Sequence, residues 1–374
     1  MERNLLVLTH NLGGGALAFL QQRQKEEWIG RSFFCMCPEG RFNLEPAELR
    51  IFLFGQPEAG TLLPFSKKSL QILLQELHIG EIFVNSLVGY PMRLIWQWLP
   101  EAGVPYMVFL HDYHCVCPEW ALTCLARYCR ESSSNSYCQH ELPWKGGMPL
   151  AEWRQGFSAL LQGATGIQSP SSYAARIVQQ VYPQLEVKIR PHVIAWPLRR
   201  TFQPRFAQRQ PLRLVFLGAF WRTKGALEIL ELHDFILEHG LSIQLIVLGG
   251  IVWQDVGDRA RALAWAGGYD KNDVSDLLAG LETAVVLVPS RFPETYCYTA
   301  SEALLSGYPV LSFDIGAQAV RIEKYDCGWV LPAGSQSGGI DELCAWADYI
   351  ATRKGREEIL RKAAHTSRFS NGME

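Results

Sequence analysis

The stretch that most limits the possible folds of this chain covers residues 283–313, with the sequence TAVVLVPSRFPETYCYTASEALLSGYPVLSF. Its first part, 283–288, is a continuous apolar run rich in valine, as is typical of a parallel strand covered by helices on both faces. Pro289 and Pro293 end this strand, because proline continues neither a β-ladder nor a helix. A helix over about 299–306 and a second strand over 309–313 follow. The pattern predicts an α/β domain.

Two glutamates lie at the centre of this stretch. Glu294 is on the predicted turn, and Glu302 is on the helix behind it, with seven residues between them. A carboxylate at the carboxyl end of a strand, facing a helix N-terminus with free N–H groups, is suited to a polar ligand that carries an anion. The spacing alone would arise by chance, because the chain has 37 acidic residues. Its setting between a strand, a Phe-Pro turn and a helix of small residues makes it specific.

The segment SRFPETYCYTASEALLSGYPVL resembles the E-x7-E signature of the retaining glycosyltransferases of family 4, which have the GT-B fold. The resemblance is closest to bacterial members that act in cell-surface polysaccharide assembly. It implies an α/β fold of two facing Rossmann-like domains with a central cleft, and a nucleotide-diphosphate sugar as donor substrate. It also implies that Glu294 contacts the donor sugar and stabilises an oxocarbenium-like transition state, and that Glu302 accepts from the ribose hydroxyls. Backbone N–H groups of Tyr298 and Thr299 would hold phosphate.

The chain departs from the family at Cys297, where many members have glycine. A side chain there restricts the backbone and bears on the geometry of phosphate binding.

The rest of the chain alternates between strands and helices, which implies parallel sheets with helices on both faces. Strand-like runs lie at 4–9, 32–37, 50–54, 82–85, 107–110, 166–169, 187–190, 213–218, 243–248 and around 329–331; helical runs lie at 16–26, 66–78, 90–99, 150–161, 172–181, 225–239, near 258–266, and at 275–281, 341–352 and 356–366. The proline- and arginine-rich run 192–211 interrupts this pattern. We therefore predict a first domain over 1–198, a linker over 199–211 and a second, nucleotide-sugar-binding domain over 212–374. The last helix is expected to pack back toward the first domain.

Two glycine-containing turns are candidate phosphate sites. In the second half, Gly218 ends a strand and is followed by Arg222 and Lys224, whose charges suit a diphosphate leaving group. A solvated basic pair at a strand end is the alternative, and the resemblance implies the phosphate role. In the first half, Gly14 and Gly15 belong to a glycine-rich turn between the first strand and helix, where backbone N–H groups can approach a diphosphate. An ordinary tight turn is the alternative there.

His111 ends the strand-like run 107–110, at the edge of a parallel sheet where ligands collect. It can donate to a sugar hydroxyl or stabilise developing charge, or it can simply cap a turn. The sequence LHDY resembles the family's motif at this place, and the resemblance implies that His111 lies near the reacting carbon of the donor sugar. Asp112 is then expected to orient the loop.

A cysteine cluster in the first half leaves two interpretations open. Cys115, Cys117, Cys124, Cys129 and Cys138 lie near His111 and His114, and thiolates with imidazole can bind zinc. The C-x-C spacing is unlike the usual C-x2-C pairs, so we expect reduced thiols and no metal.

Composition restricts the remaining function classes. With 19% charged residues and a net charge of −2, the chain is globular and has no overall attraction for nucleic acid. No apolar run approaches the ~20 residues of a membrane span, so we expect a cytoplasmic protein. The resemblance implies that the acceptor is a glycan or a lipid-linked saccharide at the inner face of the cell membrane, with peripheral contact there. The resemblance also implies retention of anomeric configuration. We expect no cofactor and no divalent metal, because cationic side chains and a helix N-terminus would serve the leaving diphosphate. A nucleotide-sugar epimerase or hydrolase, and an inactive binding subunit, are the rival interpretations.

Overall fold

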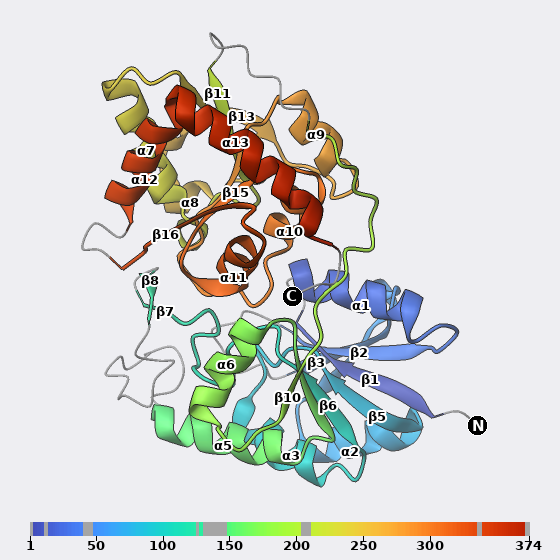
Figure 1. The fold of residues 1–374 in the computed structure, drawn as a ribbon. Helices are drawn as coiled ribbons and strands as arrows, with labels where there is room; N and C mark the ends of the chain where they lie inside the picture. Colours follow the sequence, from blue (N-terminus) through green and yellow to red (C-terminus); the bar gives the residue numbers. More distant parts are fainter. Residues whose placement is uncertain are drawn as a thin grey trace. The chain divides into compact units, whose positions relative to one another are not determined.

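The computed structural model describes residues 3–10, 14–39, 48–124, 127–129, 148–202, 211–334 and 339–370. The chain divides into two compact units (Figure 1). Unit 1 comprises Met1–Leu122 and Cys129–His192, and unit 2 comprises Thr123–Tyr128 and Val193–Glu374. Apart from Thr123–Tyr128, unit 2 begins just after His192. Arg199, within the predicted linker, donates its backbone N–H to Ser275 Oγ at 3.0 Å.

Unit 1 is built on an eight-stranded sheet with the order β10-β9-β6-β5-β1-β2-β3-β4. Its strands are β1 (Asn4–Leu8), β2 (Phe33–Pro38), β3 (Glu48–Leu53), β4 (Thr61–Pro64), β5 (Ile79–Val84), β6 (Tyr106–Phe109), β9 (Gly166–Ser169) and β10 (Val187–Ile189). Its helices are α1 (Gly14–Glu26), α2 (Lys67–Glu76), α3 (Met92–Glu101), α5 (Leu150–Gln162) and α6 (Ser172–Val181). The short strands β7 (Thr123–Cys124) and β8 (Arg127–Tyr128) form a separate hairpin.

Unit 2 is built on a six-stranded, fully parallel sheet with the order β13-β12-β11-β14-β15-β16. Its strands are β11 (Leu212–Leu217), β12 (Ile243–Leu248), β13 (Ala264–Gly267), β14 (Val285–Val288), β15 (Val310–Phe313) and β16 (Gly328–Leu331). Its helices are α7 (Ala226–Glu238), α8 (Trp253–Val256), α9 (Val274–Gly280), α10 (Tyr298–Leu305), α11 (Gly316–Tyr325), α12 (Ile340–Ala351) and α13 (Arg353–His365). The strand order reverses between β11 and β14, and in such sheets a ligand crevice opens at the carboxyl ends of the strands at that point.

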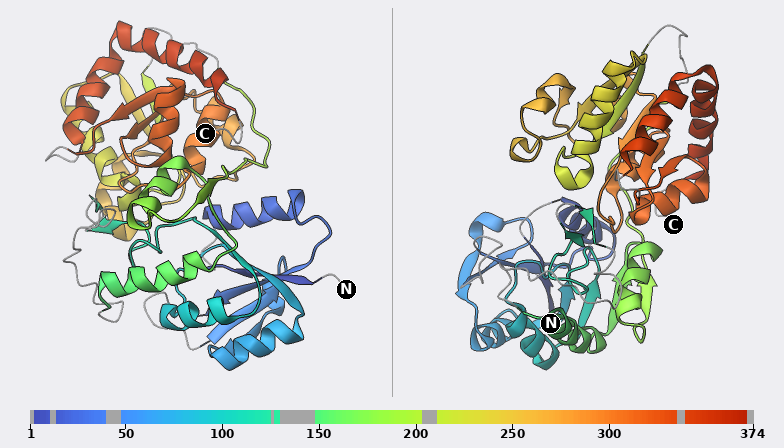
Figure 2. Two further views of the ribbon diagram at one scale, coloured as in Figure 1. Left: turned by 60° about the horizontal axis from the view of Figure 1, so that its bottom comes forward. Right: turned by 90° about the vertical axis from the view of Figure 1, so that its left-hand side faces the viewer.

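The core of unit 2 follows from the alternation of side chains along its strands. In β11, Leu214 and Phe216 pack with α7 and α12, whereas Val215 and Leu217 pack with α9 and α10 on the other face. Figure 2 shows the helices lying on both faces of this sheet. Because both faces are covered, the strands are apolar throughout, which is the pattern that the sequence of β14 predicted.

Three predictions about elements need correction. The strand predicted at 50–54 is β3, which pairs antiparallel with β2. Strand β4, which was not predicted, pairs antiparallel with β3. The sheet of unit 1 is therefore mixed and not fully parallel. The helix predicted near 258–266 is a short 3-10 turn, Asp258–Ala262, followed by strand β13. Pairing of β13 along β12 outweighs the helical propensity of its alanines. Helix α11, between β15 and β16, was not predicted.

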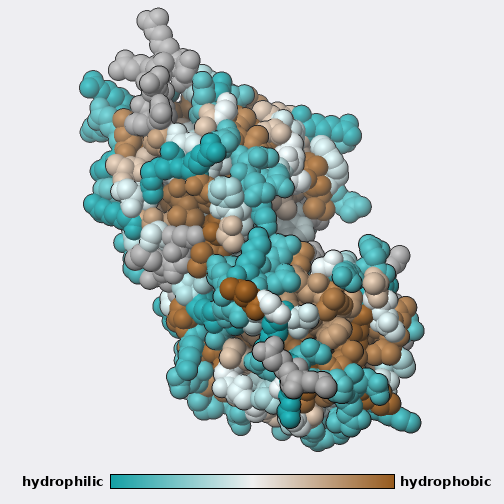
Figure 3. Space-filling view, turned by 90° about the vertical axis from the view of Figure 1, so that its right-hand side faces the viewer, coloured by the Kyte–Doolittle hydropathy of each residue, from teal (hydrophilic) through white to brown (hydrophobic). Residues whose placement is uncertain are grey.

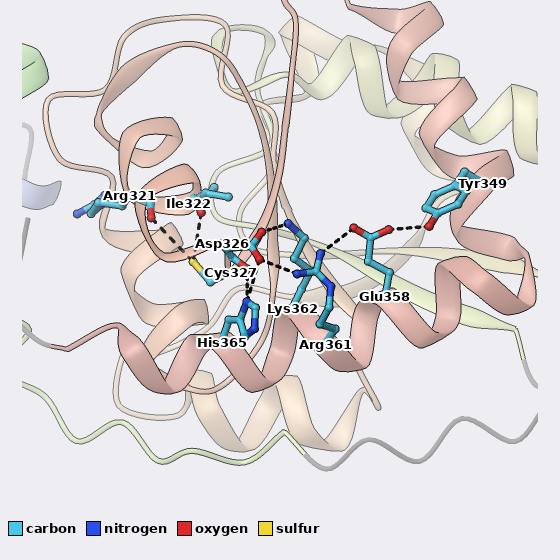
Figure 4. Close-up of polar contacts among 9 residues, drawn as sticks. All are labelled: Arg321, Ile322, Asp326, Cys327, Tyr349, Glu358, Arg361, Lys362 and His365. Carbon is cyan, nitrogen blue, oxygen red and sulfur yellow. Dashed lines mark hydrogen bonds and ion pairs between the residues drawn. The ribbon is translucent and has the colours of Figure 1, made fainter.

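An ion-pair network holds α13 onto unit 2 (Figure 4). Asp326, at the C-terminal end of α11, pairs with Arg361 at 2.6 Å, with Lys362, and with His365 at 3.0 Å. These hydrogen bonds and charges lower the pKa of Asp326 to about 2. Helix α13 packs on α12 and β16. Packing of this helix toward the first domain stays a prediction.

Both units expose large apolar side chains. Ile29 in unit 1 is 74% exposed and Leu237 in unit 2 is 67% exposed. Figure 3 shows apolar side chains among polar ones on one face of the molecule. None of the helices in the described part of the chain has both the length and the apolar character that a membrane span requires.

Candidate active site

Most of the predicted site residues lie in unit 2, in the loops that follow β11 and β14. These two strands flank the reversal of strand order, so their loops border the expected crevice. The loop after β11 carries Gly218, Arg222 and Lys224, and the loop after β14 carries Glu294. Helix α10 begins at Tyr298 and brings Glu302 into its second turn.

Lys224 and Glu294 form an ion pair in which Glu294 is buried and the Lys224 side chain is 25% exposed. Lys224 Nζ lies 2.8 Å from Glu294 Oε2, and Ser290 Oγ donates to Glu294 Oε1. Burial raises the pKa of Glu294, but the charge of Lys224 and hydrogen bonds from Lys224, Ser290 and Cys297 outweigh burial and hold that pKa below its usual value. Burial likewise opposes the charge on Lys224, and Glu294 raises the pKa of Lys224 above its usual value. Both groups are therefore ionised at neutral pH.

The two loops are fastened to each other behind this pair. The backbone N–H of Arg291 donates to Thr223 O at 2.8 Å, and the Arg291 guanidinium lies 3.2 Å from Glu228 of α7. Gly225 has a φ of +90°, and a Cβ there would lie 2.1 Å from Pro289 O, so only glycine permits this approach. The Lys224–Glu294 contact is thus set by backbone packing between loops that are far apart in the sequence.

Glu302 is in a different environment. It is 4% exposed, and its Oε2 has no hydrogen-bond partner among the described residues. Burial raises the pKa of Glu302 to about 7, although the charge of Lys271 and a hydrogen bond from Tyr269 lower it in part. A buried carboxyl with one unsatisfied oxygen is suited to accept a hydrogen bond from a ligand.

The N-terminus of α10 lies against the end of β11. Gly218 has a φ of +115°, and a Cβ there would meet Thr299 Cγ2 at 3.2 Å. Cys297, which precedes the helix, has a φ of +67° and caps it with no side-chain hydrogen bond. Since the first N–H groups of a helix have no partner within it, those of Tyr298 and Thr299 can bind an anion. Arg222 is exposed on the 3-10 turn Arg222–Lys224.

Several residues near these groups were missed by the sequence analysis. Tyr298 packs on Trp196, with ring centroids 5.6 Å apart, and Lys271 Nζ lies 4.8 Å from the centre of the Trp196 ring. Arg321 of α11 is 1% exposed and donates to the carbonyls of Tyr296 and Cys297. Trp196 lies in the segment 192–211, whose prolines led us to predict a break between domains. Arg321 lies in α11, which was not predicted. A single sequence carries no signal for the contact of Trp196 with Tyr298 or of Arg321 with the turn.

In unit 1, His111 follows β6 and packs among aromatic rings. Its ring is 4.8 Å from that of Phe19 and 5.2 Å from that of His192, to which it is nearly parallel at 7°. Burial lowers the pKa of His111 well below its usual value, and the charges of His192, His10 and Arg23 lower it further. His111 is therefore a neutral imidazole at pH 7.

Gly14 and Gly15 form the first turn of α1. Gly14 has a φ of +69° and open space where a Cβ would lie. The other residues of the predicted glycine-rich turn, 11–13, lie outside the described residues.

The cysteine cluster is only partly described. Cys115 and Cys117 are buried, and burial raises the pKa of the Cys115 thiol. Cys138 and the side chain of Cys124 lie outside the described residues. Among the residues that are described, no three histidine, cysteine, aspartate or glutamate side chains gather as a metal site would require. The expectation that the cluster binds no zinc stays a prediction.

Solved structures share this fold over almost the whole chain. Anabaena HepE in complex with UDP and glucose has 13% sequence identity and a TM-score of 0.61, covering 99% of this chain and 96% of HepE. The sucrose-phosphate synthase from Thermosynechococcus elongatus has 15% identity and a TM-score of 0.57, covering 98% and 97%. The pneumococcal O-GlcNAc transferase GtfA, in complex with UDP and GlcNAc, has 13% identity and a TM-score of 0.55, covering 86% of this chain and 61% of GtfA.

No protein-family model matches the chain, and no curated protein does. At these identities the likeness concerns the fold, and the chain has the GT-B fold, as the sequence analysis predicted.

Proposed function

We propose that this protein is a retaining glycosyltransferase that moves a sugar from a nucleotide-diphosphate sugar to a glycan or lipid-linked saccharide without a divalent metal. The observation that carries the proposal is the arrangement of unit 2 at the reversal of strand order. An ionised Lys224–Glu294 pair and a buried Glu302 with an unsatisfied oxygen flank the N-terminus of α10. The complexes of HepE and GtfA with UDP, on the same fold, support a nucleotide-diphosphate donor.

Each group has a chemical task in this proposal. The N–H groups of Tyr298 and Thr299, with the cations Arg222 and Lys224, hold the diphosphate and stabilise the charge that develops on it as the sugar leaves. The Glu294 carboxylate, kept ionised by Lys224, stabilises the positive charge that develops at the sugar. Glu302 accepts from the ribose hydroxyls through its free oxygen.

The Lys224–Glu294 contact adds a requirement to this scheme. The ammonium of Lys224 is directed to Glu294, so it serves the diphosphate either by bridging the two anions or by moving to the phosphate. In both cases removing Glu294 leaves the Lys224 ammonium without its carboxylate partner. The effects of substituting the two residues should therefore not be additive.

His111 in unit 1 completes the proposed set. As a neutral imidazole it donates a hydrogen bond to a donor-sugar hydroxyl, and it adds no positive charge near a developing cation. Gly14 and Gly15 at the start of α1 are proposed to approach the donor diphosphate.

The test is ligand-observed NMR with a panel of nucleotide-diphosphate sugars in EDTA, followed by product analysis with and without saccharide acceptors. The proposal expects one donor to bind and its sugar to reach an acceptor with its anomeric configuration retained. Release of free sugar, or a changed donor sugar, at the same rate without an acceptor would instead show a hydrolase or an epimerase. Binding without turnover would show an inactive subunit.

A further inference from the structure

Arg321 is a buried cation with no role in the proposed chemistry. Its residue is 1% exposed, and its guanidinium donates to Tyr296 O, and to Cys297 O at 3.2 Å, with the Tyr296 ring 4.4 Å away. Within the described part of the chain no carboxylate pairs with it. Figure 4 shows the Arg321 side chain extending away from the Asp326 network. A buried cation without a carboxylate is costly, so backbone carbonyls and one ring must supply its stabilisation.

The carbonyls that Arg321 binds belong to a strained turn. Cys297 has a φ of +67° and a ψ of +84°, in the left-handed region, where any side chain is disfavoured. Such a conformation is unfavourable and persists only where the surroundings determine it. Helix α10 begins at the next residue, so the conformation of Cys297 sets the direction of the N–H groups of Tyr298 and Thr299.

The first turn of α11 supports the same segment from its other end. The N–H of Ala317 donates to Glu294 O at 2.9 Å. Gly316 has a φ of +86°, and a Cβ there would lie 2.7 Å from the backbone N of Glu294. One helix therefore fixes the backbone at both Glu294 and Cys297.

We propose that Arg321 is a positioning residue for the donor site. By binding the carbonyls of Tyr296 and Cys297, it holds Cys297 in the left-handed conformation and keeps the N-terminus of α10 directed at the diphosphate. It reaches the ligand only through this turn, and its charge strengthens the positive potential of the helix N-terminus. The identity of that ligand rests on the proposed function. The role of Arg321 in holding the turn does not.

A double-mutant design separates this role from ordinary core packing. Arg321→Met keeps apolar bulk and removes the donors. Cys297→Gly removes the penalty on a positive φ, whereas Cys297→Ala removes the thiol and keeps that penalty. If Arg321 holds the turn, Cys297→Gly should offset part of the effect of Arg321→Met, and Cys297→Ala should not. Lys324→Met, an exposed cation on the same helix, is the matched control.

The first measurement is hydrogen exchange of a peptide covering 294–306, which needs no substrate and includes the hydrogen-bonded amides of α10, beginning with Ser301 N–H to Cys297 O. Arg321→Met should speed exchange there by about 10-fold, as loss of ~1.4 kcal/mol of local stability would, with β14 unchanged. Adding Cys297→Gly should restore slower exchange. If Arg321→Met does not fold, Arg321→Lys, which keeps the charge but lacks the planar fork, should give a smaller increase of the same kind.

The second measurement is calorimetric titration with UDP, GDP and ADP separately. Weakening by about 10-fold in Arg321→Met, with recovery in the Cys297→Gly double variant, supports the whole inference. Altered exchange with no nucleotide bound by any variant supports the positioning role and counts against the proposed function. Unchanged exchange at 294–306, or equal recovery with Cys297→Ala and Cys297→Gly, overturns the inference.

Discussion

The two glutamates of the E-x7-E pattern differ in charge state because their neighbours differ. Glu294 has a cation at 2.8 Å, and Glu302 is buried with a tyrosine hydroxyl as its donor. The spacing of the two residues in the sequence could not show this difference, since it depends on Lys224 and Tyr269, which other strands bring into place. The pKa of each glutamate is therefore set by its own neighbours.

The first prediction separates the roles of these acids. Glu294→Gln should lower kcat with a modest change in donor KM, because its contact matters most as charge develops in the transition state. Glu302→Gln should raise donor KM and cost kcat less, because a ribose contact is made in both states. A hydrogen bond to a charged group is worth ~1.5–3 kcal/mol, so each change should cost roughly 10- to 100-fold. Donor-saturation kinetics decide this, with circular dichroism as a folding control; exchanged profiles would refute the roles.

A second prediction concerns Glu302 and pH. Its folded pKa of about 7 lies above the ordinary value of 4.5, so folding favours the protonated form. The contribution of protonated Glu302 to the free energy of unfolding is fully present below pH 4.5 and is lost as the pH rises through about 7. Glu302→Gln should therefore stabilise the ligand-free protein at pH 8, by up to about 3 kcal/mol, and change little at pH 5.

Thermal unfolding at both pH values measures this, with the exposed Glu238→Gln as control. An equal effect of Glu302→Gln at pH 5 and pH 8 would contradict the buried, proton-binding state of Glu302.

At the scale of elements, periodicity predicted most strands and helices of unit 2, because strands covered on both faces are continuously apolar. It missed α11, whose sequence GAQAVRIEKY begins with glycine. A charged residue on such a helix suggests a solvated face, yet Arg321 is buried by the turn that it binds. Strand β13 was missed because four residues, AWAG, are too short to show a period.

The third prediction belongs to the contact between α11 and α13. Asp326→Asn should lower stability by on the order of 1 kcal/mol at pH 7, a modest value because its side chain is 42% exposed and its ion pairs are screened. The depressed pKa means that this stability is present above the ordinary value of 3.8 and is lost as the pH falls through about 2.

Urea unfolding at pH 7, with the exposed Glu323→Gln on α11 as control, measures the loss. If the two variants unfold alike, the Asp326 network does not stabilise the attachment of α13.

At the scale of the whole molecule, the sequence predicted the GT-B fold, and the fold explains why the candidate residues converge. Loops after β11 and β14 meet because the strand order reverses between those strands. The pairing of side chains then depends on close backbone approaches, such as that of Gly225 to Pro289. The spacing of residues along the chain does not reveal such approaches.

A fourth prediction concerns metal. Turnover should persist in EDTA, because the proposed scheme assigns the leaving charge to Arg222, Lys224 and the N-terminus of α10. Arg222→Ala should lower turnover by ~10²-fold, as expected when a donor directed at developing charge is removed. Complete loss in EDTA with recovery on adding Mg²⁺ or Mn²⁺ would exclude the metal-free mechanism.

The most direct test of the central claim is nucleoside-diphosphate binding to unit 2 within the full chain. UDP, GDP, ADP and TDP are titrated separately by calorimetry in EDTA against the wild type, Lys224→Met, Glu302→Gln and the control Lys324→Met. The account predicts that at least one of them binds the wild type and the control alike. Lys224→Met and Glu302→Gln should each bind it about 10-fold or more weakly. No binding by the wild type, or binding that both site variants retain in full, would contradict the account.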